Sequence, residues 1–120
     1  MRIVSWNVQR AVADDEVWNN IIAWFGKNYN NANLSMEGSA KETGVGVRRM
    51  QQLFKKNLGT TPKSWLQELR LKEAAKLLLE SDDRVSDIAY NVGFNTPSHF
   101  NRAFKSKEGC SPSEYRNKSK

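Results

Sequence analysis

Two sets of hydrogen-bonding side chains recur fifty positions apart in this chain of 120 residues. Each set falls on a segment whose apolar residues have helical spacing, and at about 100° per residue it lies opposite the apolar face. The first set is Arg48, Gln51, Gln52 and Lys55, and the second set is Ser98, Asn101, Arg102 and Lys105. Arginine can pair with guanine, and glutamine or asparagine with adenine, in the major groove, while lysine suits phosphate contact. The pattern therefore predicts two surfaces that contact double-stranded DNA.

A solvated polar face is the alternative interpretation, because every surface helix has such a face. For a single helix that simpler interpretation is favoured. Here neither set contains an acidic residue, and each follows a turn glycine, Gly44 or Gly93. The net charge of +6 arises entirely within residues 36–120. A basic domain suits a polyanionic partner, although many ordinary proteins are equally basic. The repetition of the pattern is what favours nucleic acid.

The two sets belong to an internal duplication of the chain. Both copies consist of a short helix, a glycine turn, a longer helix, a glycine stop and a helix that begins at proline. The matched pairs are Ala40 with Ala89, Gly44 with Gly93, Phe54 with Phe104, Gly59 with Gly109, Pro62 with Pro112, and Trp65 with Tyr115. A small residue four positions before the turn glycine lets two helices approach closely, which is the layout of a helix-turn-helix.

Apolar spacing, capping residues and helix breakers predict an all-α fold of about seven helices. The predicted helices cover residues 17–28, 36–43, 47–58, 62–80, 85–92, 97–107 and 112–115. We expect an N-terminal arm or linker at 1–16, a first helix-turn-helix subdomain at 17–60, a connecting helix at 61–81 and a second subdomain at 82–120. The only weak strand pattern is the alternation of Val4, Trp6 and Val8.

The segment VSDIAYNVGFNTPSHFNRAFKSKEGCSPSEYR, residues 85–116, resembles the signature of the AraC/XylS family of bacterial transcription regulators. The segment LFKKNLGTTPKSWLQELRLKEAAKLL is similar to the same family's first unit and central helix. The resemblance covers residues 17–116. It implies two helix-turn-helix subdomains joined by a long helix, with recognition helices at 47–58 and 97–107 that enter successive major-groove segments of one duplex.

The resemblance also implies roles for individual residues. By position, the side chains expected to contact bases are Arg48, Gln51, Gln52, Ser98, His99 and Arg102. Those expected to contact the DNA backbone are Lys55, Thr96, Asn101 and Lys105. The first unit departs from the family pattern at Gly38, Ser39 and Gly46, where a polar, a large apolar and a capping residue are usual. We therefore expect the first unit to be looser and to contribute less specificity than the second.

Other classes of function are less well supported. One histidine, one cysteine and no clustered carboxylates predict no enzyme, no metal site and no cofactor. A protein-interaction module without specific DNA readout is the alternative, because the apolar helix at 17–25 could bind a partner. Packing of this helix on the core of the first unit is the favoured interpretation. With a single cysteine, Cys110, and no apolar run of membrane length, we expect a cytoplasmic, nucleoid-associated protein without membrane contact. The expected partners are promoter DNA and RNA polymerase, and the expected state is a monomer.

Overall fold

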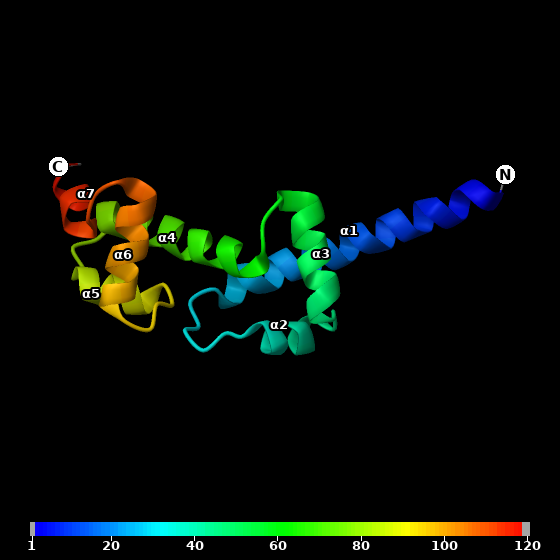
Figure 1. Cartoon of the computed structure of the whole chain (residues 1–120), viewed down its shortest axis with the longest axis horizontal. Helices are drawn as coiled ribbons and strands as arrows, with labels where there is room; N and C mark the ends of the chain where they lie inside the picture. The colour runs from blue at the N-terminus through cyan, green and yellow to red at the C-terminus, as the bar shows by residue number, and fades with distance from the viewer. Residues whose placement is uncertain (1, 119–120) are drawn as a thin grey trace. The chain divides into compact units, whose positions relative to one another are not determined.

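The computed structural model describes the backbone of residues 2–118 and the side chains of residues 14–118. This part of the chain is all helical, as predicted, and Figure 1 shows its helices in order. They are α1 (Arg2–Asn28), α2 (Met36–Thr43), α3 (Val47–Leu58), α4 (Pro62–Glu80), α5 (Val85–Asn91), α6 (Pro97–Glu108) and α7 (Pro112–Lys118). The bounds of α2, α3 and α4 are those predicted from the sequence. Within these residues no helix is both long enough and apolar enough to cross a membrane.

The N-terminal region differs from the prediction. An arm was expected at residues 1–16, with a weak strand pattern at Val4, Trp6 and Val8, but α1 begins at Arg2. Residues 2–16 contain neither glycine nor proline. β-branched residues lower helix propensity by only a few tenths of a kcal/mol each, so they do not stop a helix that is already formed. The helix predicted at 17–28 therefore continues towards the N-terminus.

The chain divides into two compact units, and neither unit is a single stretch of sequence. The first consists of Met1–Lys27 and Ser35–Pro62, and the second consists of Asn28–Leu34 and Lys63–Lys120. Nearly all of α4 thus belongs to the second unit, although it was predicted as a separate connector. The short segment after α1 also belongs to the second unit, so the chain passes between the units at three places.

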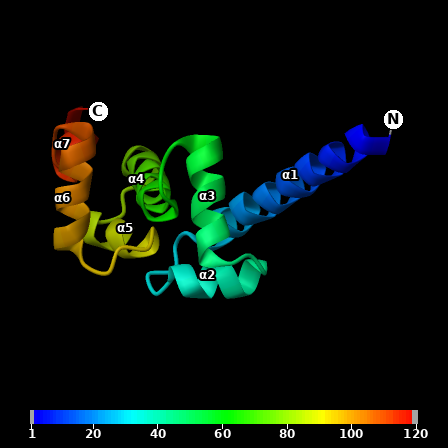
Figure 2. The same cartoon turned by 45° about the vertical axis from the view of Figure 1, so that its right-hand side comes forward.

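The core of the first unit is built by α1, α2 and α3. Ile21 and Phe25 of α1 are fully buried, as are Met50 and Phe54 of α3. The rings of Phe25 and Phe54 meet edge to face, with centroids 5.7 Å apart, and Trp18 meets Phe54 at 4.9 Å. In the views of Figures 1 and 2, α2 lies against one end of α3, with which it is in contact. The apolar face predicted at 17–25 is therefore used inside the first unit.

The core of the second unit gathers apolar side chains from α4, α5, α6 and the turn between α5 and α6. Its buried members are Leu71, Ala74, Leu78, Ile88, Ala89, Val92, Phe94, Phe100 and Phe104. Helix α6 packs on α5 and on α7. The guanidinium of Arg116 donates to the carbonyl oxygens of Leu78 at 2.9 Å and Ser81 at 3.0 Å. These bonds satisfy carbonyl groups that the end of α4 would otherwise leave without partners.

Capping residues and glycines set the helix ends, largely as predicted. The side chains of Ser35 and Thr96 cap α2 and α6. Gly44 ends α2 in the left-handed conformation, with φ at 73°. At α7, the Ser111 N–H donates to the Glu114 carboxylate, while the Glu114 N–H donates to the Ser111 hydroxyl. The hydrogen bonds with Ser111 hold the pKa of Glu114 below its usual range.

Candidate nucleic-acid interface

Helix α3 has one buried face and one polar face. Met50, Leu53 and Phe54 are buried on the inner face. Because the core fixes this face, the rotation of the helix about its axis is also fixed, and the opposite residues must point outward. The predicted contact residues of the first unit, Arg48, Gln51, Gln52 and Lys55, are all exposed.

The structure brings these four side chains together around one hollow of about 650 Å³. The hollow is also lined by residues that were not predicted as contacts, Lys56, Thr60 and Thr61. The two threonines follow the glycine that ends α3, where the chain turns back towards the helix. The helical period alone could not indicate them, because they lie in a loop. The Thr60 hydroxyl and the Lys56 ammonium add hydrogen-bond donors to this surface.

Arg49 lies next to Arg48 but is engaged elsewhere. Its guanidinium forms an ion pair with the carboxylate of Asp14 on α1. The Arg49 side chain is 50% exposed and that of Asp14 is 24% exposed, so water screens the pair and its stabilising effect is small. The ion pair directs Arg49 towards α1.

Helix α6 repeats the arrangement of α3 in the second unit. Phe100 and Phe104 are fully buried on its inner face. The predicted contacts Thr96, Ser98, His99, Asn101, Arg102 and Lys105 are all exposed. The His99 ring lies edge to face against Phe94, with centroids 5.2 Å apart. The Thr96 hydroxyl accepts a 3.2 Å hydrogen bond from the His99 N–H, which fixes the first turn of α6.

Two hollows flank α6, and Arg102 lines both of them. The hollow of about 590 Å³ is lined by His99 and Arg102, together with residues of α4. The other, of about 470 Å³, is lined by Asn101, Arg102 and Lys105, together with residues around the start of α7. Thr96 and Ser98 line neither hollow. The structure thus gathers the second set around Arg102, with Ser98 and Thr96 at the beginning of the helix.

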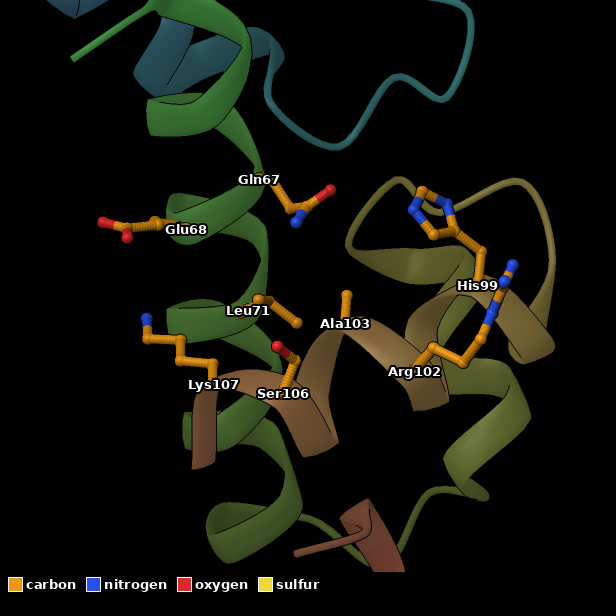
Figure 3. Close-up of a pocket in the computed structure, with 8 residues that line it drawn as sticks. All are labelled: Gln67, Glu68, Leu71, His99, Arg102, Ala103, Ser106 and Lys107. Atoms are coloured by element: carbon orange, nitrogen blue, oxygen red, sulfur yellow. The ribbon is translucent and has the colours of Figure 1, made fainter. Parts of the chain in front are cut away.

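The hollow between α4 and α6 has an apolar floor and a polar edge (Figure 3). Leu71 of α4 and Ala103 of α6 point towards each other at its floor. Arg102 extends back along α6 towards His99, and Gln67 of α4 points towards the same edge. Gln67 was not predicted from the sequence, because only the packing of α4 within the second unit brings it near α6.

The cations of the two sets form no close ion pair among the described side chains, although the charge of Lys105 helps to lower the pKa of the exposed Glu114. In that part of the chain, the ion pairs are Arg49–Asp14 and Arg84–Asp87. Neither pair involves a cation of the two sets, namely Arg48, Lys55, Arg102 or Lys105. These four charges are exposed and available to an anion such as DNA phosphate.

Hydrogen bonds partly compensate for the departures from the family pattern in the first unit. Ser39 is completely buried, and its hydroxyl donates a 2.8 Å hydrogen bond to the Met36 carbonyl. Gly46 precedes α3 without any side-chain cap. Ser35 caps α2 by accepting a 2.9 Å hydrogen bond from the Gly38 N–H. The lower rigidity of the first unit remains a prediction.

Comparisons with known proteins give matches over most of the chain. A family model described as a helix-turn-helix domain matches residues 39–118. The transcriptional activator RhaS of Escherichia fergusonii is 37% identical over 98 residues, which are 82% of this chain and 35% of the activator. The lactose operon transcription activator of Staphylococcus xylosus is 31% identical over 92% of this chain and 39% of its own length. The chain therefore spans little more than a third of either relative.

Two solved structures have a similar fold. The C-terminal domain of AraT, a response regulator from Geobacillus stearothermophilus, has a TM-score of 0.79 at 29% identity and covers 85% of this chain. The match covers 84% of the AraT domain. The DNA-binding domain of the global transcriptional factor AdpA, solved in complex with a target DNA, has a TM-score of 0.76 at 28% identity. That match covers 81% of this chain and 86% of the AdpA domain.

Proposed function

The chain belongs to the AraC/XylS family of helix-turn-helix transcription regulators, and we propose that it reads promoter DNA with the outer faces of α3 and α6. The observation that carries this proposal is the repeated surface. Each helix buries an apolar face in its own unit and exposes an acid-free set of hydrogen-bonding side chains at matching positions. Helix faces that were merely solvated would not need hydrogen-bonding residues at matching positions in both units.

Bases are read by side chains at the exposed face of each helix. On α3 these are Arg48, Gln51 and Gln52, and on α6 they are Ser98, His99 and Arg102. An arginine that donates two hydrogen bonds to guanine discriminates against other bases by about 1–3 kcal/mol. Arg102 is the strongest candidate for such a contact, because it is exposed, central to the second set and outside the ion pairs of the described side chains.

The DNA backbone is held by Lys55, Asn101, Lys105 and the first turn of α6. Lysines late in each helix lie beyond the base-reading residues and suit phosphate contact. The N-terminus of α6 presents the Ser98 N–H and the positive end of the helix dipole to a phosphate, while the His99 N–H is bonded to the capping Thr96. These contacts supply affinity without sequence preference, and their contribution decreases as salt increases.

We further propose that α3 and α6 enter successive major-groove segments about one helical turn, or 34 Å, apart. One copy of the chain would then occupy an asymmetric site of roughly 20 base pairs as a monomer. Activation of transcription through contact with RNA polymerase, in the cytoplasm where a bacterial promoter lies, completes the proposal. The names of the similar activators support this part.

Selection of bound sequences from a random DNA pool tests the proposal. We expect two blocks of preferred bases whose centres lie about 10 base pairs apart. Binding should also weaken steeply between low and moderate salt. Binding without sequence preference, or no binding at all, would contradict the proposal and favour a protein-interaction module. A single block of preferred bases would contradict the use of both helices.

A further inference from the structure

The segment Asn28–Leu34, here called the strap, precedes the first helix-turn-helix in sequence but belongs to the second unit. The side chain of Tyr29 packs against the buried core of the second unit. Burial raises the pKa of the Tyr29 hydroxyl, and the nearby negative charge of Glu73 raises it further. The strap is therefore an integrated part of the second unit.

Arg70 of α4 fixes the path of the strap. Its Nε donates a 2.7 Å hydrogen bond to the Tyr29 carbonyl oxygen, and its terminal nitrogen donates a 2.9 Å hydrogen bond to the Asn31 carbonyl oxygen. The side chain is half-buried, and burial lowers the pKa of the guanidinium. Two directional bonds from one planar group define the position of the strap backbone more closely than one bond can.

The turn between α5 and α6 lies directly against the place where Arg70 binds the strap. Gly93 has φ at 105°, and a Cβ built on it would lie 2.7 Å from the Tyr29 carbonyl oxygen and 2.8 Å from Nε of Arg70. The next residue, Phe94, stacks edge to face with Phe100 and with His99 of α6. A contact chain thus runs from Arg70 through the turn backbone to the first turn of α6.

We propose that Arg70 is a positioning residue for the second reading helix and that it acts through the strap and the α5–α6 turn. The side chain itself touches no base in this mechanism. It holds the Tyr29 carbonyl group against which Gly93 rests, and this contact sets where the turn delivers the start of α6. The consequence for DNA readout rests on the proposed function, whereas the consequence for the turn does not.

The first test uses the full chain without DNA. The amides of Val92, Gly93 and Phe94 donate to backbone carbonyls, so their hydrogen exchange reports opening of the turn. We expect Arg70→Ala to accelerate exchange at these amides about tenfold and to leave α3 unchanged, because two charge-assisted hydrogen bonds are lost. Lys76→Ala is the matched control: Lys76 is exposed on the same helix, and its removal also deletes one positive charge.

The outcomes of this test separate positioning from general stability. Unchanged exchange at the turn would overturn the proposal. Equal acceleration throughout α4, α6 and the turn would also overturn it, because Arg70 would then merely stabilise the unit. Arg70→Lys keeps a cation but cannot donate two bonds in a fixed fork, so its exchange at the turn should be intermediate. If exchange at the turn in Arg70→Lys equalled that of the unaltered protein, a role for the two fixed donors of the guanidinium would be contradicted.

The second test measures half-site dependence in DNA binding. Scrambling the bases that α6 reads should lower the DNA affinity of the Arg70→Ala variant less than it lowers that of the unaltered protein, because the variant already reads those bases poorly. Scrambling the bases that α3 reads should lower the DNA affinity of both proteins by the same factor. Equal dependence on the α6 bases in both proteins would overturn the positioning role. If the unaltered protein shows no preference at either half-site, the proposed function fails, and the exchange result still decides the role of Arg70 at the turn.

Discussion

The hydroxyl oxygen of Ser39 lies 3.6 Å from the sulfur of Met50 inside the first unit. Ser39 occupies the position that matches Ile88 in the duplication, and both residues are completely buried. The small serine is therefore part of the first core, as Ile88 is part of the second. Met50, a long and flexible side chain, lies against it where the second unit places Phe100.

Enlarging Ser39 should destabilise the first unit. We expect Ser39→Ile to lower the free energy of unfolding by about 1–3 kcal/mol, because the added carbon atoms have to displace Met50. Ser39→Ala is the control: it removes the hydrogen bond to Met36 without adding volume, so its effect should stay within about 1 kcal/mol. Urea unfolding followed by tryptophan fluorescence measures both variants. A higher stability for Ser39→Ile would show that the core has room for a larger side chain.

The amides of α2 should exchange with solvent faster than those of α5. Helix α2 buries only Ser39 and carries Gly38, which lowers helix propensity by about 1 kcal/mol relative to alanine. Helix α5 buries Ile88 and Ala89. Hydrogen exchange of the free protein compares the two helices under one condition. Equal protection would contradict the prediction that the first unit is the looser one.

The sequence predicted most of the elements, because local signals mark their ends. Ser35, Gly44 and Pro62 indicated helix starts and stops that the structure confirms. The exposed faces of α3 and α6 were also predictable, since helical period and apolar residues define the opposite faces. His99 was expected only through the family resemblance.

Features that depend on distant residues were not predicted. Tyr29 of the strap is bound by Arg70, which lies 41 positions later, whereas the predicted helices at 17–28 and 36–43 left residues 29–35 only as a connection between them. Gln67 approaches α6 only because α4 packs against α6 within the second unit. The helical start of α1 was missed because the alternation of Val4, Trp6 and Val8 resembles a strand, whereas continuity with a packed helix decides the conformation.

Replacing Arg102 should alter which DNA is preferred as well as how tightly it is bound. We expect Arg102→Ala to weaken binding at the target site about 5- to 150-fold, or about 1–3 kcal/mol, and to relax the preference at one base pair. Lys107→Ala is the control, because Lys107 lines the same hollow but extends away from His99 (Figure 3). Binding to a panel of single-base variants measures both effects. An equal loss on every sequence would show that Arg102 contacts the backbone.

Replacing a phosphate-contacting lysine should change the salt dependence without changing preference. For Lys55→Ala and for Lys105→Ala, we expect affinity to fall nearly uniformly across sequences. The slope of log affinity against log salt should decrease in magnitude by about 1 for each variant. Titrations at several salt concentrations, on a target and an unrelated duplex, provide the measurement. An unchanged slope would remove that lysine from the DNA backbone contacts.

Gly93 should tolerate alanine far less than another left-handed glycine does. Gly109, at the end of α6, has φ at 82°, but no atom lies within 4 Å of the point that a Cβ would occupy there. Gly109→Ala should therefore cost only the conformational strain of about 1–2 kcal/mol. Gly93→Ala adds a collision with the Tyr29 carbonyl oxygen and should lower the melting temperature clearly more. Thermal unfolding of the two variants gives the comparison. Similar melting temperatures would mean that the strap moves aside easily.

The interleaved order of the two units has a consequence for how such regulators recombine. A genetic crossover at Pro62 alone would join α4 and the second helix-turn-helix of one regulator to the strap of another. The strap contributes the carbonyl groups of Tyr29 and Asn31 to its contact with Arg70, and the α5–α6 turn contributes Gly93. A hybrid can therefore tolerate foreign side chains at many strap positions, provided that the backbone follows the same path and the incoming helix retains its arginine.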